Sequence, residues 1–187
     1  MKPGALLLAP GAGSDRNHSC LVAIEEAVAP LPVERMDFLY RKAGRKPPDR
    51  APVLLAAVHA EAEALILRTK KKAASLVLGG RSMGGRICSM AVTDGLPAAG
   101  LVLISYPLHP PGKPEKLRTE HLPNLTLPCL FIHGTKDPFG SPAELQVATA
   151  AIPGAVTHIW VDGRGHDLKS SDALVAAAVV DWLSTIR

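Results

Sequence analysis

The sequence is poor in aromatic residues and cysteines, and it has no long apolar run. Aromatic residues make up 4% of its 187 residues, so alanine, leucine and valine must supply most of the core. The three cysteines, Cys20, Cys88 and Cys129, are odd in number and far apart, and they form neither a CxxC pair nor a disulfide framework. This use of cysteine favours a reducing compartment.

Neither the charge nor the hydropathy of the chain indicates a nucleic-acid or membrane partner. There are 21 Lys and Arg against 17 Asp and Glu, and the net charge of +4 is too small to predict nucleic-acid binding by itself. The apolar stretch at residues 5–9 is too short for a signal-peptide core or a membrane span. We therefore expect a cytoplasmic protein. Its length corresponds to a single domain, residues 1–187.

Short apolar runs alternate with helical patterns along the whole chain. They predict strands at residues 5–9, 33–38, 75–79, 100–105, 127–133 and 156–161. Helices are predicted at residues 17–29, 51–72, 85–92, 142–151 and 172–186, and residues 41–50 form a loop rich in proline and cations. Apolar strands that alternate with amphipathic helices predict an α/β fold, with a doubly wound, mostly parallel sheet of six strands covered on both faces.

The most informative motif is the pentapeptide GRSMG at residues 80–84, which is the only G-x-S-x-G in the sequence. It follows an apolar strand and precedes a helical pattern, and this context is typical of a nucleophile elbow. The glycines suit the motif because strand and helix close so tightly that side chains there would collide. A glycine-rich turn with an incidental serine is the structural alternative. The context favours Ser82 as the nucleophile of a serine hydrolase.

A serine nucleophile needs a base, and the base needs a partner that holds its tautomer. In this architecture the acid and then the histidine follow the serine along the chain, each at the carboxyl end of a strand. Asp137 and His166 occupy such positions. We interpret His133, at the end of an apolar strand, as a residue that shapes the acid turn, and Asp162 is the alternative acid.

Two backbone amides must stabilise the oxyanion of an acyl-transfer reaction. Met83 supplies one, because it follows the nucleophile. The loop after the first strand supplies the other, with Ala12 preferred and Gly13 possible. The structural alternative is a plain turn in which Ser14 or Asn17 caps the next helix.

Several segments together resemble the α/β-hydrolase superfamily: the elbow, GTKDPFG at 134–140 and GRGHD at 163–167. YPLHPPGKP at 106–114, with PGAGSD at 10–15, is similar to a family of small predicted hydrolases akin to dienelactone hydrolases. The resemblance covers essentially the whole chain. It implies a six-stranded parallel sheet without the first strands of larger relatives, a serine–histidine–aspartate triad, and ester- or thioester-type substrates. One departure is Pro10, where many relatives carry histidine.

Two other functions compete with a hydrolase. Gly11 and Gly13 open a helix after a strand, as in dinucleotide-binding domains, but the third glycine position holds Arg16. Some relatives serve as non-catalytic subunits of larger assemblies, so a catalytically silent interaction module is the second alternative. It predicts loss of triad members, and all three are present. No H-E-x-x-H, paired Cys/His spacing or P-loop indicates a metal or cofactor.

The sequence also offers candidate substrate contacts. Residues 106–126 are too few for a helical cap domain, so we expect an open site with Tyr106 in one wall. Arg81 and Arg164 flank the predicted nucleophile and base, and such cations can steer anionic substrates or clamp a carboxylate. Solvated loop side chains or structural ion pairs are the alternative. The predicted partner is a small acyl substrate.

Overall fold

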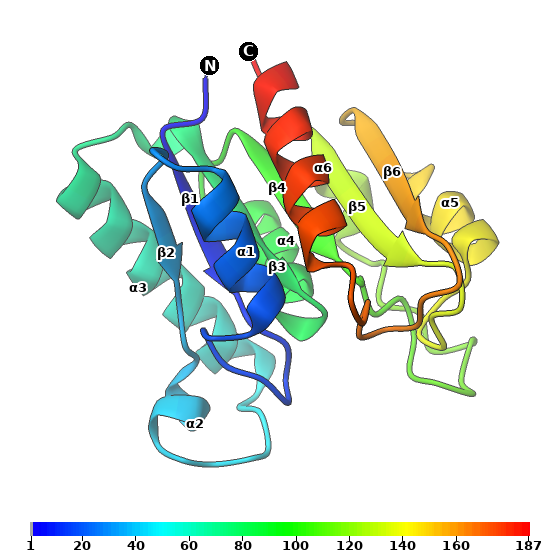
Figure 1. Cartoon of the computed structure of the whole chain (residues 1–187). Coiled ribbons are helices and arrows are strands. Elements are labelled where there is room, and N and C mark those ends of the chain that lie inside the picture. Colours follow the sequence, from blue (N-terminus) through cyan, green and yellow to red (C-terminus); the bar gives the residue numbers. More distant parts are fainter. Residues whose placement is uncertain (1) are drawn as a thin grey trace.

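The computed structural model describes residues 2–187, and its centre is a sheet of six strands (Figure 1). The strands are β1 (Ala5–Ala9), β2 (Val33–Arg35), β3 (Leu76–Arg81), β4 (Gly100–Ile104), β5 (Cys129–Gly134) and β6 (Val156–Val161). They lie in the order β2-β1-β3-β4-β5-β6, and every neighbouring pair is parallel. The predicted sheet is therefore confirmed, and it is parallel throughout.

Helices cover both faces of this sheet. They are α1 (Ser19–Ala27), α2 (Leu39–Lys42), α3 (Ala51–Thr69), α4 (Met83–Thr93), α5 (Pro142–Thr149) and α6 (Asp172–Thr185), with short 3-10 turns η1 (Ala73–Ser75) and η2 (Leu122–Asn124). Helices α1 and α6 lie side by side on one face, and α3, α4 and α5 cover the other (Figure 1). The fold is thus doubly wound, as the alternating pattern predicts.

The core consists of two apolar layers, one on each face of the sheet. Strand β1 is buried along its whole length, with Leu7 in the layer under α3 and α4 and Leu6 and Leu8 in the layer under α1 and α6. A parallel strand covered on both faces is an uninterrupted apolar run rather than an alternating one. This is why residues 5–9 are easily identified as a strand.

Some helices and strands begin or end at other residues than the sequence pattern predicts, because local contacts set their ends. Helix α1 begins at Ser19, because the ring of His18 accepts a hydrogen bond from the Cys20 amide and caps the first turn. Strand β2 stops after three residues, and α3 ends where Lys70 takes a left-handed conformation with φ of 55°. The Ser141 cap is confirmed as a capping box with Glu144.

The carboxyl ends of all six strands meet at one edge, which is the lower edge in Figure 1. Between β4 and β5 the chain forms only the short turn η2, so no cap domain covers this edge. Ligand sites of parallel α/β sheets lie outside the carboxyl ends of the strands. No helix within residues 2–187 combines the length and the apolarity needed to cross a membrane.

Candidate active site

Ser82 occupies a sharp turn between β3 and α4, as the G-x-S-x-G motif predicts. Its φ of 52° and ψ of −121° lie in a sparsely populated region that typically costs about 1–3 kcal/mol. A Cβ atom at Gly80 or Gly84 would collide with the backbone carbonyl of Ala9 on the neighbouring strand. Close packing of β3 and α4 against β1 therefore requires both glycines and holds the serine in this conformation.

The structure brings together Ser82, His166 and Asp137 from three different turns. The Nε2 atom of His166 lies 2.8 Å from the Ser82 hydroxyl, and its Nδ1 atom lies 2.8 Å from Oδ2 of Asp137. A carboxylate can only accept, so Nδ1–H donates to Asp137 and Nε2 is left to accept the serine proton. The side chains thus form one continuous chain of hydrogen bonds.

Neighbouring groups fix both the acid and the imidazole. The Phe139 amide donates to Oδ1 of Asp137 at 2.8 Å, and the Asp137 side chain is fully buried. The Phe139 ring lies on the imidazole of His166, with the ring centres 4.1 Å apart. The guanidinium of Arg81 donates to the backbone carbonyl of His166 at 2.9 Å. His166 is therefore held by its ring, its Nδ1 atom and its backbone.

The alternative acid and the second histidine have other contacts. Asp162 accepts a hydrogen bond from the Thr135 hydroxyl at 3.2 Å on the exposed side of the turn. His133 is fully buried, and its Nε2 atom donates to the Gly140 carbonyl at 2.7 Å and lies 3.5 Å from Oδ2 of Asp137. Burial lowers the pKa of His133. It lies beneath the acid turn, as predicted, and away from the serine.

Ala12 and Met83 line the same pocket as Ser82. The Ala12 carbonyl accepts a hydrogen bond from the Tyr40 hydroxyl at 2.8 Å, which fixes the turn after β1. Neither the Ala12 amide nor the Met83 amide donates to another backbone or side-chain group among the described residues. Both donors are therefore free to bind an oxygen atom beside the serine. Gly13 also borders the pocket.

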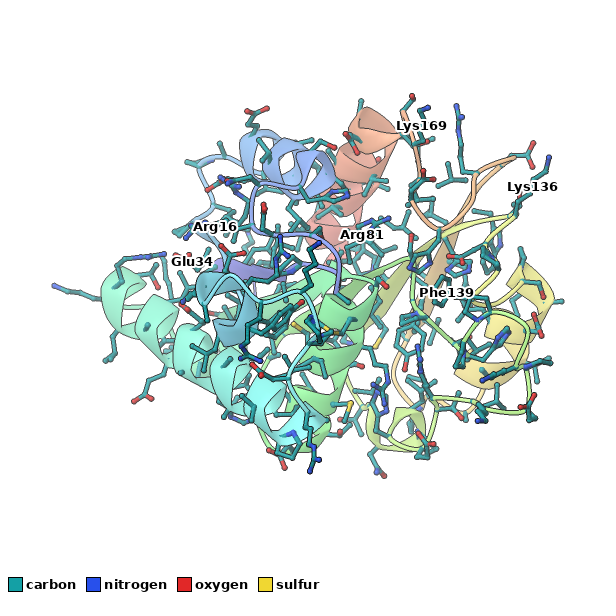
Figure 2. The ribbon with its side chains drawn as sticks, turned by 90° about the horizontal axis from the view of Figure 1, so that it is seen from below. Arg16, Glu34, Arg81, Lys136, Phe139 and Lys169 are labelled. Carbon is teal, nitrogen blue, oxygen red and sulfur yellow. The ribbon has the colours of Figure 1, made fainter. Side chains whose placement is uncertain are left out.

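The pocket at the sheet edge has a volume of about 460 Å³. Figure 2 looks onto this edge, with Arg81 and Phe139 toward its middle and Lys136 and Lys169 farther out. Two further arginines, Arg86 and Arg118, border the pocket, and the sequence analysis missed them. Arg86 lies one helical turn after Ser82, a spacing that places both on one face of a helix, whereas no local signal identifies Arg118. A larger apolar hollow of about 610 Å³ lies between α5 and residues 108–123 and contains no member of the hydrogen-bonded trio.

Two predicted substrate contacts are misplaced. The Tyr106 side chain is buried against Phe131, its hydroxyl donates to the Arg118 carbonyl at 2.6 Å, and the neighbouring Pro107 borders the pocket instead. Packing of a scarce aromatic ring into the core outweighs its exposure at the site. The Arg164 side chain is exposed and lies outside the pocket lining. Arg81 does border the pocket, but its Nη2 atom is bound to His166.

Residues 2–187 contain no cluster of three or more His, Cys, Asp or Glu side chains that could hold a metal ion. The groups around the pocket are hydrogen-bond donors, one imidazole and three guanidinium groups. Burial lowers the pKa of Arg81. The site places a serine hydroxyl that is hydrogen-bonded to an imidazole beside two amides without partners among these residues, and attack on a carbonyl group requires such an arrangement.

Solved structures of other proteins share this fold. A dienelactone hydrolase from Anabaena variabilis superposes with a TM-score of 0.78 at 20% identity, over 99% of this chain and 87% of that one. A thermophilic esterase from Thermogutta terrifontis gives 0.75 at 19% identity, over 100% and 92%. An alpha-beta serine hydrolase homologue from Coxiella burnetii gives 0.77 at 16% identity, over 98% and 86%.

These structural similarities establish the fold, and the sequence adds the family. A profile of the family described as alpha/beta hydrolase domain matches residues 2–178, nearly the whole chain. The match spans the elbow at residues 80–84 and the turns that carry Asp137 and His166. By sequence and by structure, this chain belongs to the alpha/beta hydrolase domain family.

Proposed function

We propose that the protein is a serine hydrolase that cleaves a small ester, thioester or lactone through an acyl-enzyme on Ser82. The observation that carries this proposal is the continuous hydrogen-bond chain from Ser82 through His166 to Asp137, beside two free amides in an open pocket. Family membership and esterase-like structural neighbours support hydrolase chemistry. The intact trio disfavours a catalytically silent module.

The geometry leads to a two-step reaction. As the Ser82 oxygen attacks the substrate carbonyl, Nε2 of His166 takes the hydroxyl proton, and Asp137 stabilises the imidazolium that forms. The amides of Ala12 and Met83 bind the oxyanion of the tetrahedral intermediate. His166 then returns the proton to the leaving group, and water attacks the acyl-enzyme by the reverse sequence of proton transfers.

The three cysteines support the proposed cytoplasmic location. All are free and buried, and burial raises the pKa of each thiol to about 12. Such thiols neither form a disulfide framework nor react readily as nucleophiles. Buried thiols are therefore poor competitors of Ser82 as the proposed nucleophile.

A fluorophosphonate probe tests the nucleophile directly. We expect covalent labelling of the wild type and none of Ser82→Ala. Turnover by Ser82→Ala should be lower than that of the wild type by roughly 10⁴-fold or more, because serine and base act as a unit. Ser184→Ala, on the exposed face of α6, is the matched control and keeps full labelling. Equal labelling of Ser82→Ala and wild type contradicts the assignment. A panel of chromogenic esters, lactones and acyl-thioesters then identifies the substrate class.

A further inference from the structure

Arg86 and Arg118, here called the arginine pair, border the pocket that Ser82 and His166 also line. Arg86 belongs to α4, and its amide donates to the Ser82 carbonyl at 3.1 Å, so its position is tied to that of the serine. Arg118 belongs to the segment between β4 and β5. Its backbone is fixed twice, by the Leu108 carbonyl at 2.9 Å and by the Tyr106 hydroxyl at 2.6 Å.

The arginine pair has no carboxylate partner among the described residues. Its members form no ion pair within 4.0 Å, the Nε atom of Arg86 is buried without a hydrogen-bond partner, and the one side-chain bond of Arg118 is a long one, 3.4 Å to the Pro107 carbonyl. Some other arginines of the chain are paired, whereas Arg81, which also borders the pocket, is not paired within residues 2–187. Arg16, Arg35, Arg45 and Arg68 all lie within 3.1 Å of an acidic side chain.

The two guanidinium groups also repel each other. Burial, followed by the charge of Arg86, lowers the pKa of Arg118. The charge of Arg86 likewise contributes, after burial, to the lowered pKa of His121. Partly buried cations without counter-charges are unfavourable until an anion joins them. A pocket that holds two such groups beside a nucleophile is therefore suited to an anionic ligand.

We propose that the arginine pair binds a carboxylate of the substrate, so that the enzyme prefers esters or thioesters that carry a free carboxylate away from the reacting carbonyl. This inference rests on the proposed function of Ser82. Guanidinium groups bind carboxylates through paired, charge-assisted hydrogen bonds, which fix the orientation of the ligand as well as its affinity. Arg81 also borders the pocket, but its Nη2 atom donates to the His166 carbonyl, so we assign it to positioning His166 and leave it out of the arginine pair.

Matched esters test the proposal. We compare kcat/KM for mono-para-nitrophenyl adipate, which carries a carboxylate, with that for para-nitrophenyl hexanoate, which has the same chain length and none. In Arg86→Gln and Arg118→Gln we expect the adipate-to-hexanoate ratio to fall about 10- to 100-fold, the effect of losing a hydrogen bond to a charged group. Arg68→Gln removes an exposed arginine near the far end of α3 and controls for net charge. Its ratio equals that of the wild type.

The outcomes separate the subsite from the proposed hydrolase. A wild type that hydrolyses the hexanoate with no preference for the adipate overturns the subsite and leaves the hydrolase standing. A loss of preference in Arg164→Gln, with the arginine pair variants unchanged, also overturns it. If the wild type hydrolyses neither ester and Ser82 is not labelled by the fluorophosphonate, the proposed function fails.

Calorimetry with adipate on Ser82→Ala then decides the subsite independently of activity. Adipate that binds Ser82→Ala, and binds the double variant with Arg118→Gln at least tenfold more weakly, supports the subsite. Absence of adipate binding to Ser82→Ala, or equal binding to both proteins, overturns the subsite. The thermal midpoint of each variant verifies that the fold is kept.

Discussion

Two sets of residues at the pocket, here called the serine side and the arginine side, differ in whether their polar groups are satisfied within the protein. On the serine side, Ser82, His166 and Asp137 are joined by hydrogen bonds of 2.8 Å. On the arginine side, Arg86 and Arg118 have no acidic partner among the described residues. A complete internal network positions groups for chemistry on a neutral carbonyl, whereas unpaired cations require a partner from outside. Under the proposed function, the serine side carries out the reaction and the arginine side selects the substrate.

The largest effect that tests the serine side is expected from Asp137→Asn. The substitution keeps the shape of the side chain but removes the charge that holds the Nδ1–H tautomer of His166, so kcat for the hexanoate ester should fall roughly 10⁴-fold. Asp162→Asn is the matched control, because Asp162 bonds Thr135 instead. A severe loss in Asp162→Asn together with normal turnover in Asp137→Asn would show that the acid is misassigned.

A smaller effect is expected from Phe139→Ala. The ring lies 4.1 Å from the imidazole of His166, while the backbone amide of residue 139 continues to bind Asp137. Loss of the ring leaves the base less well positioned, so kcat should fall by roughly 10- to 100-fold with little change in KM. Phe139→Leu retains part of the packing surface and should recover part of kcat. If only the thermal midpoint changes, the ring has a purely structural role.

The smallest expected effect is on the pH dependence of the free energy of unfolding, and it tests the description of the arginine side. Burial, and then the charge of Arg86, lower the pKa of His121 to about 4, and the neutral ring donates from Nε2 to the Ser89 hydroxyl at 2.7 Å. The unfolded state takes up this proton near pH 6.5 and the folded state only near pH 4, so the free energy of unfolding should decrease as pH falls through that interval. Buried His133 adds to the same trend.

Thermal unfolding between pH 7 and pH 4 measures this effect. In Arg86→Gln the pKa of His121, followed by NMR, should rise toward its ordinary value, and the dependence of stability on pH should weaken correspondingly. A pKa of His121 that is unchanged by the substitution would show that the guanidinium of Arg86 lies away from the ring. The position of the Arg86 side chain in the arginine pair would then be wrong.

Much of the fold follows from local patterns in the sequence. The run at residues 5–9 and the other apolar strands predict a parallel sheet, because only a sheet covered on both faces buries such runs completely. The ends of elements were predicted less well. His18 caps α1 through a ring nitrogen, and Lys70 ends α3 in a left-handed turn, and neither residue type is a strong signal for these positions.

The sequence by itself determined the elbow and the turns that carry Asp137 and His166. The motif at residues 80–84 identifies the turn because its glycines allow the close approach to the Ala9 backbone on β1 that this kind of turn requires. Asp137 and His166 were predicted because each follows an apolar strand, and parallel strands bring their carboxyl ends to one edge.

Only the tertiary structure decided which side chains meet at that edge. Whether His166 bonds Asp137 or Asp162 depends on how the turns after β5 and β6 pack together, and spacing along the chain does not encode this. Tyr106 turns into the core and Arg118 into the pocket, although both belong to one segment. Side-chain direction at the end of a strand is set by packing against distant residues, and a sequence pattern reports only near neighbours.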